Sequence, residues 1–348
     1  MEQEELYAKL PEALLPWFRL NARDLPWRRD REPYHVWLSE IMLQQTRVEA
    51  VRAYYLRFLE TLPTLQSLAD ADEGVLLKLW EGLGYYSRAR NLQKAARVIV
   101  SEHGGQFPTD FAAIRALPGI GPYTAGAIAS ICFEQPRAAV DGNVLRVVSR
   151  LTENRSPVDL PEVRKDCTER LEAVYPAGSC GAFTQALMEL GATVCTPRSP
   201  RCAACPCMRF CLAREHETAA VLPVRLPKKD KREEEKTVFL FCCGDRLAIR
   251  RRPDRGLLAG LWELPNETGT LDAAAALRKA EALGLHPAEL QRELHRVHIF
   301  THVRWEMTGY VIRCREEAAD FVWAGEAELR ERYALPTAFR QFLDVSGD

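Results

Sequence analysis

Four cysteines, Cys195, Cys202, Cys205 and Cys211, follow one another with C-x6-C-x2-C-x5-C spacing. Four thiolates so close in sequence can hold either a zinc ion or a 4Fe-4S cluster, because both accept four sulfur ligands. Zinc ribbons usually contain two C-x2-C pairs, and only Cys202 and Cys205 form such a pair here. The wider spacings favour the larger iron–sulfur cluster; zinc ligation and four buried, unliganded cysteines are the alternatives. Cys207 lies outside the pattern and is not expected to be a ligand.

A glycine-rich turn, Leu117-Pro-Gly119-Ile120-Gly121, precedes an apolar segment that starts at Tyr123. Glycine permits a tight turn and lets backbone N–H groups approach a phosphate oxygen, aided by the N-terminus of the following helix. The pattern is typical of a helix–hairpin–helix element, whose contacts position a duplex without reading its sequence. An ordinary turn between two helices is the structural alternative.

Two acidic residues are candidates for catalytic roles. Glu40 lies between apolar residues in the predicted helix Trp37–Thr46, where desolvation would favour the protonated form and suit a general acid. Asp141 stands at a predicted helix N-terminus, where the helix dipole favours the ionised form. A solvated glutamate on a helix face and a simple helix N-cap are the structural alternatives.

These residues lie in a region with helical periodicity. Apolar residues recur at three- and four-residue spacing from Glu2 to about Arg214, and helix starts are marked at Asp72-Glu73, Thr109-Asp110 and Pro161-Glu162. Residues 216–236 are rich in proline and charge, which predicts a linker. Beyond them, residues 237–242, 247–250 and 307–313 are predicted strands and residues 272–283 a helix. The sequence therefore predicts an all-α region of residues 1–215 followed by an α+β domain.

The length indicates a multidomain protein, and the overall charge is nearly balanced. The 348 residues exceed a typical domain of roughly 100–150 residues, so two or three folded units are expected. The formal net charge is −1, and residues 1–215 carry 26 basic and 26 acidic side chains. A nucleic-acid binder usually has a basic surface. Any cationic groove must therefore be local.

The thiol content indicates a reducing compartment. The acidic residues Met1–Glu5 are not followed by an apolar region, so no secretory signal is expected. No run approaches the roughly 18–20 apolar residues that span a bilayer. Eleven cysteines in such a chain indicate reduced thiols and metal ligands rather than disulfides. We expect a cytoplasmic protein without membrane contact.

These motifs together resemble those of a known family. Residues 1–214 are similar to the helix–hairpin–helix DNA glycosylases that carry a 4Fe-4S cluster. The whole chain resembles the MutY-type adenine DNA glycosylases, which remove adenine mispaired with 8-oxoguanine or guanine. The matching strings besides the cysteines are Arg23-Asp-Leu-Pro-Trp-Arg28, Ser39-Glu-Ile-Met-Leu-Gln-Gln-Thr46, Gly82-Leu-Gly-Tyr-Tyr-Ser-Arg88, Leu117–Ala125 and Val140-Asp-Gly-Asn143.

The resemblance implies a mechanism. Glu40 would protonate a ring nitrogen of adenine, and Asp141 would stabilise the oxocarbenium-like sugar, as the two carboxylates of retaining glycosidases do. Tyr123 would hydrogen-bond Asp141, and Asn143 would orient the carboxyl group or a water molecule. Lyase-competent relatives carry lysine at the position of Tyr123, and a phenol cannot form their Schiff base. We therefore expect base excision without strand cleavage.

The resemblance also implies binding residues. The adenine pocket would include Arg23, Trp27, Arg28 and Gln185. Gln45 and Tyr85 would wedge into the duplex, although Trp27 and Tyr85 could instead be core aromatics. The hairpin residues Leu117, Gly119, Ile120 and Gly121 would contact a DNA phosphate.

The C-terminal part resembles a Nudix domain, and its segment Phe300-Thr301-His302 would read 8-oxoguanine. Thr301 replaces the family's serine but keeps a hydroxyl group. Of the glutamates of the Nudix hydrolase box only Glu281 remains, so magnesium-dependent pyrophosphate hydrolysis is not expected.

The domain organisation follows from the resemblance. Residues 30–135 would form a six-helix domain with the hairpin, and residues 1–29 with 136–215 the cluster domain. Residues 237–348 would form the 8-oxoguanine recognition domain. We expect a monomer that acts on double-stranded DNA with A:8-oxoG or A:G mispairs, with protein partners left open. Another mismatch glycosylase, for instance one for thymine, a non-catalytic damage-binding scaffold and a nucleotide-pool hydrolase are the alternative functions.

Overall fold

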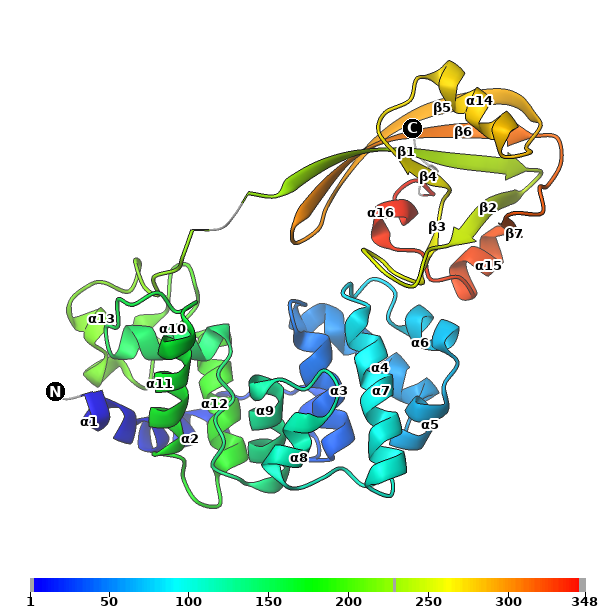
Figure 1. Ribbon diagram of the computed structural model, residues 1–348. Helices are drawn as coiled ribbons and strands as arrows, with labels where there is room; N and C mark the ends of the chain where they lie inside the picture. The colour runs from blue at the N-terminus through cyan, green and yellow to red at the C-terminus, as the bar shows by residue number, and fades with distance from the viewer. Residues whose placement is uncertain (1–2, 228–229, 344–348) are drawn as a thin grey trace. The chain divides into compact units, whose positions relative to one another are not determined.

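A computed structural model describes residues 3–227 and 230–343. Its contacts divide the chain into two compact units. The first comprises residues 1–70 and 90–227, and the second comprises residues 71–89 and 228–348. The expected combination of an all-α region and a sheet-containing C-terminal domain is confirmed (Figure 1).

The first unit is built from helices and short 3-10 turns. Helix α7 (Ser87–Glu102) begins in the second unit and continues into the first. The other helices of the first unit are α1 (Gln3–Ala8), α2 (Leu10–Asn21), α3 (Pro33–Leu43), α4 (Val48–Thr61), α5 (Leu65–Asp70), α8 (Phe111–Ala116), α9 (Pro122–Phe133), α10 (Gly142–Leu151), α11 (Pro161–Glu172), α12 (Cys180–Thr193) and α13 (Leu212–Glu215). The 3-10 turns are Pro26–Arg28, Cys202–Ala204 and Met208–Phe210.

Capping residues set where several helices begin. Asp110 accepts a hydrogen bond from the N–H of Ala113 at the start of α8, and Pro161 occupies the first turn of α11. Asp72 caps α6 (Glu73–Leu79) in the second unit in the same way as Asp110. All three predicted helix starts are confirmed. Asp141 caps α10, which fixes a candidate catalytic carboxylate by local structure alone.

Close helix packing positions the start of α10. Helices α10 and α12 contribute buried apolar residues to one core that also includes α1, α2 and α11. Gly191 of α12 faces Asn143, and a Cβ at Gly191 would lie only 2.6 Å from the Cβ of Asn143. Only glycine permits this approach, which fixes the backbone beside Asp141.

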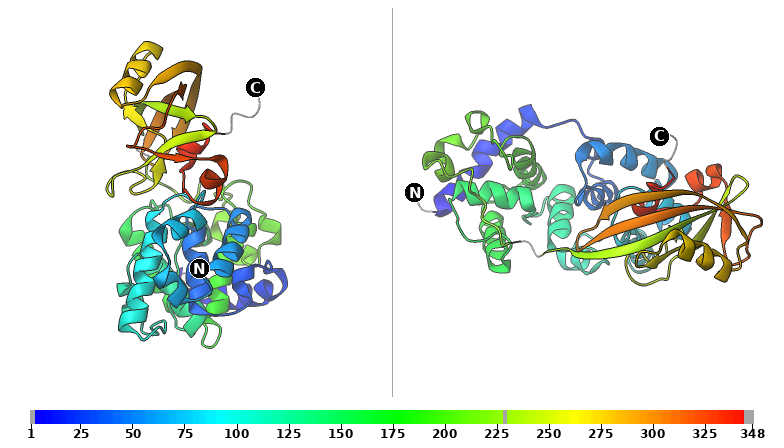
Figure 2. Two further views of the ribbon diagram at one scale, coloured as in Figure 1. Left: turned by 90° about the vertical axis from the view of Figure 1, so that its right-hand side faces the viewer. Right: turned by 90° about the horizontal axis from the view of Figure 1, so that it is seen from above.

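The second unit contains a twisted sheet with strand order β3-β2-β1-β6-β5, to which β4 and β7 add at β1 and β2 (Figure 1, Figure 2). Strands β1 and β6 are parallel, whereas β5 and β6 form a long antiparallel hairpin. Helix α14 (Ala273–Ala282) packs on one face of the sheet and α16 (Thr337–Arg340) on the other. The strands are β1 (Arg232–Cys243), β2 (Arg246–Arg251), β3 (Trp262–Glu263), β4 (Asn266–Thr268), β5 (Pro287–Ile299), β6 (Val303–Cys314) and β7 (Val322–Ala324), and α15 (Glu326–Glu331) follows them.

Residues 71–89 contact the C-terminal part of the chain. The buried carboxylate of Glu81 accepts a hydrogen bond from the N–H of Leu335 and pairs with Arg340. Lys78 donates to the backbone carbonyls of Leu329 and Tyr333. These contacts explain why this segment groups with the sheet.

The boundary between the units differs from the predicted linker of residues 216–236. Leu222 is buried, its carbonyl accepts a hydrogen bond from Arg150, and the carbonyl of Val224 accepts one from Val158. Residues 216–227 therefore pack with the first unit. At the other end, β1 begins at Arg232, because Arg232–Lys236 pair with β6 despite their charge.

None of the helices in the described ranges has the length and apolar character needed to cross a membrane.

Candidate active site

One pocket of the first unit gathers most of the predicted catalytic and adenine-binding residues. Its volume is about 640 Å³, within the roughly 300–1,000 Å³ of small-molecule sites. The residues that line it come from α3, α9, the start of α10, α11 and α12, from the segment 23–28 and from the segment between α3 and α4. They include Arg23, Trp27, Arg28, Glu40, Gln45, Tyr123, Asp141, Asn143, Arg164, Gln185 and Glu189.

Glu40 is buried, with 6% of its surface exposed. Burial raises the pKa of this carboxyl group to about 7, and the charge of Asp141 contributes in the same direction. A hydrogen bond from Tyr123 and the positive charge of Arg28 oppose the shift. Near neutral pH a large fraction of Glu40 is therefore a carboxylic acid, the state that a general acid needs. The alternative of a solvated glutamate is wrong.

Tyr123 contacts Glu40 rather than its predicted partner Asp141. Its hydroxyl group donates to Oε2 of Glu40 at 2.5 Å. Burial raises the pKa of Tyr123 well above its usual value, so the phenol stays protonated and remains a donor. Because Oε2 accepts this hydrogen bond, we assign the proton of Glu40 to Oε1. The predicted contact of Tyr123 with Asp141 is wrong. Tyr123 on α9 and Glu40 on α3 meet only through tertiary packing, which the sequence does not reveal.

Asp141 is held by three hydrogen bonds. Its Oδ1 accepts from the backbone N–H groups of Asn143 and Val144, at 2.8 and 2.7 Å, and its Oδ2 accepts from the side-chain amide of Asn143 at 2.7 Å. Burial raises the pKa of Asp141, whereas these hydrogen bonds and Arg146 oppose the increase. The helix dipole is therefore only one influence on its ionisation, and Asp141 is both an N-cap and a pocket residue.

A chain of hydrogen bonds continues behind Asn143. Arg146 donates to Oδ1 of Asn143 at 2.8 Å, to the carbonyl of Gly191 at 2.8 Å and to the carbonyl of Cys195 at 2.7 Å. The orientation of the Asn143 amide is thereby fixed, with its N–H directed to Asp141. Arg146 was not identified from the sequence, where an arginine in the second turn of a helix has no distinguishing signal.

Glu189 lines the pocket but was not predicted from the sequence. It is completely buried on α12 and forms ion pairs with Arg23 at 2.7 Å and Arg28 at 2.8 Å. Burial opposes its ionisation, but hydrogen bonds from Arg23 and Arg28 outweigh this effect and lower its pKa. The two arginines are thus fixed at the pocket wall and are neutralised there in part.

The other predicted adenine-binding and wedge residues of the first unit also line the pocket. Trp27 is buried against Tyr55 with a centroid distance of 5.5 Å and also lines the pocket, so it is both a core aromatic and a pocket residue. Gln185 lines the wall formed by α12. Gln45 has a left-handed backbone with φ of 60°, which is uncommon for a residue other than glycine. Such strain is frequently found at binding sites.

The predicted hairpin connects α8 and α9. Gly119 has φ of 76°, and a Cβ there would lie 2.6 Å from Asn91, so glycine is required at this turn. Leu117 and Ile120 are buried and anchor the turn. Gly121 is the N-cap residue of α9. A Cβ at this position would meet no other atom within 4 Å, so the backbone here is open to a ligand.

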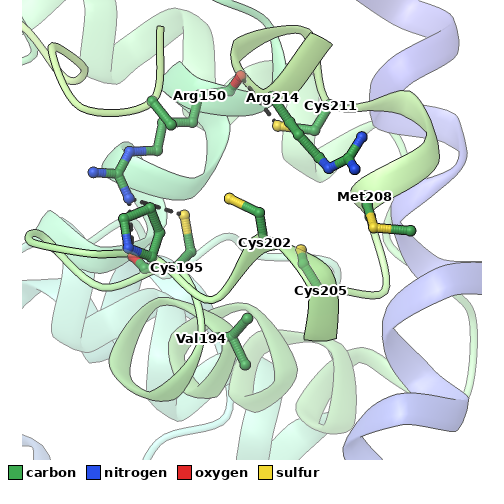
Figure 3. Close-up of a pocket in the computed structure, with 10 residues that line it drawn as sticks. Arg150, Val194, Cys195, Cys202, Cys205, Met208, Cys211 and Arg214 are labelled. Carbon is green, nitrogen blue, oxygen red and sulfur yellow. Dashed lines mark hydrogen bonds between the residues drawn. The ribbon is translucent and has the colours of Figure 1, made fainter. Parts of the chain in front are cut away.

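The four predicted cysteine ligands line a second, smaller cavity of the first unit, into which Figure 3 shows their sulfur atoms directed. Cys207 is buried but does not line it. Burial raises the pKa of Cys211 to about 11 and raises that of Cys195. A bound cation would reverse these shifts, because ligating thiols are deprotonated.

A buried arginine adjoins this cavity (Figure 3). Arg150 is 2% exposed, and its guanidinium donates to the carbonyls of Leu222, Thr196 and Pro197 and to Sγ of Cys195. Within the described ranges it has no carboxylate partner in ion-pair distance. A buried charge needs a counter-charge. An anionic centre between the cysteines would supply it, so this donor set fits a thiolate-ligated cluster.

The predicted 8-oxoguanine loop lies at the tip of the β5–β6 hairpin in the second unit. Phe300 packs edge-on against Trp305 with a centroid distance of 4.8 Å, whereas Thr301 and His302 are exposed. The hydroxyl group of Tyr85 forms a hydrogen bond with the hydroxyl group of Thr301. Tyr85 also has a left-handed backbone, with φ of 46°. Within this unit the structure thus brings a predicted wedge residue together with the predicted recognition loop.

Comparison with known proteins agrees with this arrangement. Residues 38–173 match the HhH-GPD superfamily of base excision DNA repair proteins, and residues 237–345 match the NUDIX domain. An adenine DNA glycosylase of Mus musculus is 37% identical over 95% of this chain and 77% of its own length. The chain belongs to the adenine DNA glycosylase family.

Other adenine DNA glycosylases extend beyond the matched region. That of Arabidopsis thaliana is 37% identical over 85% of this chain, which spans 56% of the length of that relative. The solved structure of a thermostable thymine-DNA glycosylase matches 62% of this chain and 97% of its own, with a TM-score of 0.55 and 30% identity. The helical fold is therefore shared with a thymine-DNA glycosylase.

Proposed function

We propose that this protein removes adenine mispaired with 8-oxoguanine or guanine by hydrolysing its N-glycosidic bond. The observation that carries the proposal is that Glu40 and Asp141 line one pocket with different environments. Glu40 is buried with a pKa near 7, whereas Asp141 accepts three hydrogen bonds that favour its anion. Burial raises the pKa of both groups, but at Asp141 three hydrogen bonds oppose the increase, which suits Glu40 to an acid role and Asp141 to an anionic role.

Adenine is a poor leaving group as an anion, which defines the task of the acid. A proton from Oε1 of Glu40 to N7 of adenine lets the base depart as a neutral molecule. The C1′–N9 bond then breaks with its electron pair on N9, and positive charge develops on the sugar. Tyr123 donates to the Glu40 carboxylate that this transfer leaves behind. General acid catalysis of this kind contributes about 10²–10⁴-fold.

Asp141 faces the positive charge that results. Its carboxylate would stabilise the oxocarbenium-like sugar until a water molecule adds at C1′ and loses a proton. Asn143 and the α10 backbone already orient this carboxylate, so little reorganisation accompanies the reaction. The base must first leave the helical stack, which costs a few kcal/mol and less at a mispair.

The substrate is tested by single-turnover cleavage of duplexes with A:8-oxoG, A:G and T:G pairs, followed by alkali to cut the abasic product. We expect cleavage at adenine in the first two duplexes and none at T:G. Cleavage at T:G with inert A:8-oxoG would overturn the proposal in favour of a thymine glycosylase. Strand cleavage before alkali would contradict the expectation that Tyr123 provides no Schiff base.

We further propose that the four cysteines hold a 4Fe-4S cluster. Zinc–sulfur bonds of about 2.3 Å would bring the four sulfur atoms within about 4 Å of one another. In the described part of the chain, no three His, Cys, Asp or Glu side chains converge closely enough to hold one metal ion. The cysteines instead surround a cavity, which favours a cluster. When bound, it would supply anionic charge beside Arg150 and rigidity to residues 195–211.

Cys202→Ser should lose the cluster. We expect the wild type to be yellow-brown with broad absorbance near 400 nm and the variant to be nearly colourless, because one of the four thiolates is missing. Cys207→Ser is the matched control and should keep its colour, since Cys207 does not line the cavity. A colourless wild type with one equivalent of zinc would contradict the cluster.

Tyr123→Phe should change the pH dependence of excision. The wild-type rate should fall as the pH rises above about 7, because Glu40 loses its proton. The hydrogen bond from Tyr123 lowers the pKa of Glu40, so its removal raises this pKa. The alkaline decline should therefore move to higher pH in the variant. A single-turnover rate profile from pH 5 to 9 measures this, and a shift to lower pH would refute the assignment.

The remaining expectations concern the setting of the reaction. We propose that Phe300, Thr301 and His302 recognise 8-oxoguanine, since Thr301 and His302 are exposed at a hairpin tip. We also propose that the protein acts as a monomer on double-stranded DNA in the cytoplasm. The balanced charge of residues 1–215 implies that only local surfaces attract the duplex.

A further inference from the structure

Two exposed arginines flank the backbone on either side of Asp141. Arg164 of α11 lines the active-site pocket, and its Nη1 donates to the carbonyl of Val140 at 2.6 Å. Arg225 lies far along the chain, in the segment predicted as a linker. Its Nη2 would be 3.8 Å from a Cβ on Gly142. The residues before and after the catalytic aspartate thus each have a guanidinium group beside them.

Arg225 is placed by specific contacts of its segment. The carbonyl of Val224 accepts a hydrogen bond from Val158 at 3.0 Å. Asp159 accepts from the backbone N–H of Leu226 at 3.0 Å and from Nη1 of Arg225 at 3.3 Å. The side chain of Arg225 remains 54% exposed. Asp159 therefore orients the guanidinium, and its Nη2 end is directed toward Gly142.

Both arginines can still bind an anion. Arg164 is exposed and donates to the carbonyl group of Val140, which does not neutralise its charge. The ion pair of Arg225 with Asp159 is solvent-exposed, and such pairs contribute little because water and salt screen them. An arginine can therefore exchange part of this contact for a phosphate, to which its planar fork is well suited.

The position of these arginines specifies the anion. A deoxynucleotide whose C1′ faces Asp141 carries phosphates on its own 3′ and 5′ oxygens, only a few bonds away. The N-terminus of α10 adds a favourable dipole at the same place. We propose that Arg164 and Arg225 form a clamp for the phosphates that flank the excised nucleotide.

The clamp rests on the proposed function, and it makes residues 216–227 part of the DNA-binding surface. It is tested by the salt dependence of binding. The probe is a duplex with 8-oxoguanine opposite a 2′-fluoro deoxyadenosine, in which the fluorine disfavours the oxocarbenium ion and slows cleavage. The Kd is measured between 50 and 200 mM salt for the wild type, Arg164→Gln and Arg225→Gln.

Each glutamine variant should make the slope of log Kd against log salt less steep by about 0.9, the loss of one phosphate contact. The ratio of the variant Kd to the wild-type Kd should accordingly be about threefold smaller at 200 mM than at 50 mM salt. Arg225→Lys should retain the wild-type slope because it keeps the charge. Arg170→Gln, on the same helix as Arg164 and paired with Asp166, should also retain it.

An unchanged slope in either glutamine variant, with a wild-type melting temperature, would overturn the clamp. An equal change in Arg170→Gln would also overturn it, because the effect would then be one of overall charge. These outcomes are separate from the proposed function, which fails if the wild type does not release adenine from an A:8-oxoG duplex.

Discussion

Glu40→Gln is expected to slow adenine excision by roughly 10³- to 10⁴-fold, the upper part of the range for a general acid. Glutamine cannot donate a carboxylic proton, so adenine would have to leave as an anion. Its amide oxygen can still accept the hydrogen bond from Tyr123, which preserves the local structure. Binding of an A:8-oxoG duplex should remain within about tenfold, or about 1.4 kcal/mol, of the wild type. Single-turnover kinetics and equilibrium binding measure the two effects.

The same variant should be more stable than the wild type at alkaline pH. Glu40 has a folded-state pKa of about 7 against 4.5 for the unfolded chain. Below pH 4.5 the carboxyl group is protonated in both states, and as the pH rises through 7 the folded state must ionise a buried group. This costs up to about 3 kcal/mol, which glutamine avoids. Denaturant unfolding of the wild type and the variant at pH 4 and pH 8 tests this stability difference. For the catalytic prediction, a normal excision rate in Glu40→Gln would eliminate Glu40 as the proposed acid.

Asp141→Asn is expected to reduce the excision rate by about 10²- to 10³-fold, because the neutral amide no longer opposes the charge of the oxocarbenium-like sugar. Asparagine is as good an N-cap as aspartate, and its oxygen can still accept from the N–H groups of Asn143 and Val144. The fold should therefore be retained, with a loss of stability of about 1 kcal/mol from the amide contact with Asn143.

Asn143→Ala is the matched comparison for Asp141→Asn. It removes one hydrogen bond to Asp141 but keeps the carboxylate and both backbone contacts. Its excision rate should lie between those of the wild type and Asp141→Asn. A rate below that of Asp141→Asn would contradict the electrostatic role given to the carboxylate.

Features encoded by neighbouring residues were predicted well. The caps Asp72 and Asp110 mark helix starts because a short polar side chain satisfies free N–H groups within its own turn. Gly119 marks the hairpin because its left-handed backbone is a local requirement. The cysteine spacing and the strings around Glu40 and Asp141 indicated the family, since they lie within short, specific segments.

Features that depend on tertiary contacts were missed or misassigned. Tyr123 contacts Glu40 across 83 residues, and Glu189 pairs with Arg23 across 166 residues. No periodicity or spacing relates such residues. Arg150, which is buried beside the cysteines, looked like an ordinary helical arginine. A buried charge can be identified only when the surrounding elements are in place.

Composition also misled the prediction in two places. Strand β5 was not predicted, because it is an edge strand whose exposed charged residues hide the alternation of Leu294 and its neighbours. Residues 216–227 resemble a linker because of their prolines, yet Leu222 is buried and Arg225 lies beside the active site. Both errors concern segments whose conformation is set by their partners.

The central claim is that Glu40 protonates N7 of adenine in the pocket that also contains Asp141. Its most direct test is single-turnover excision from a duplex in which 7-deazaadenine, with C–H in place of N7, is paired with 8-oxoguanine. We predict that this duplex binds with an affinity close to that of the adenine duplex but releases no base on the same time scale. Excision of 7-deazaadenine at a rate near that of adenine would contradict the account.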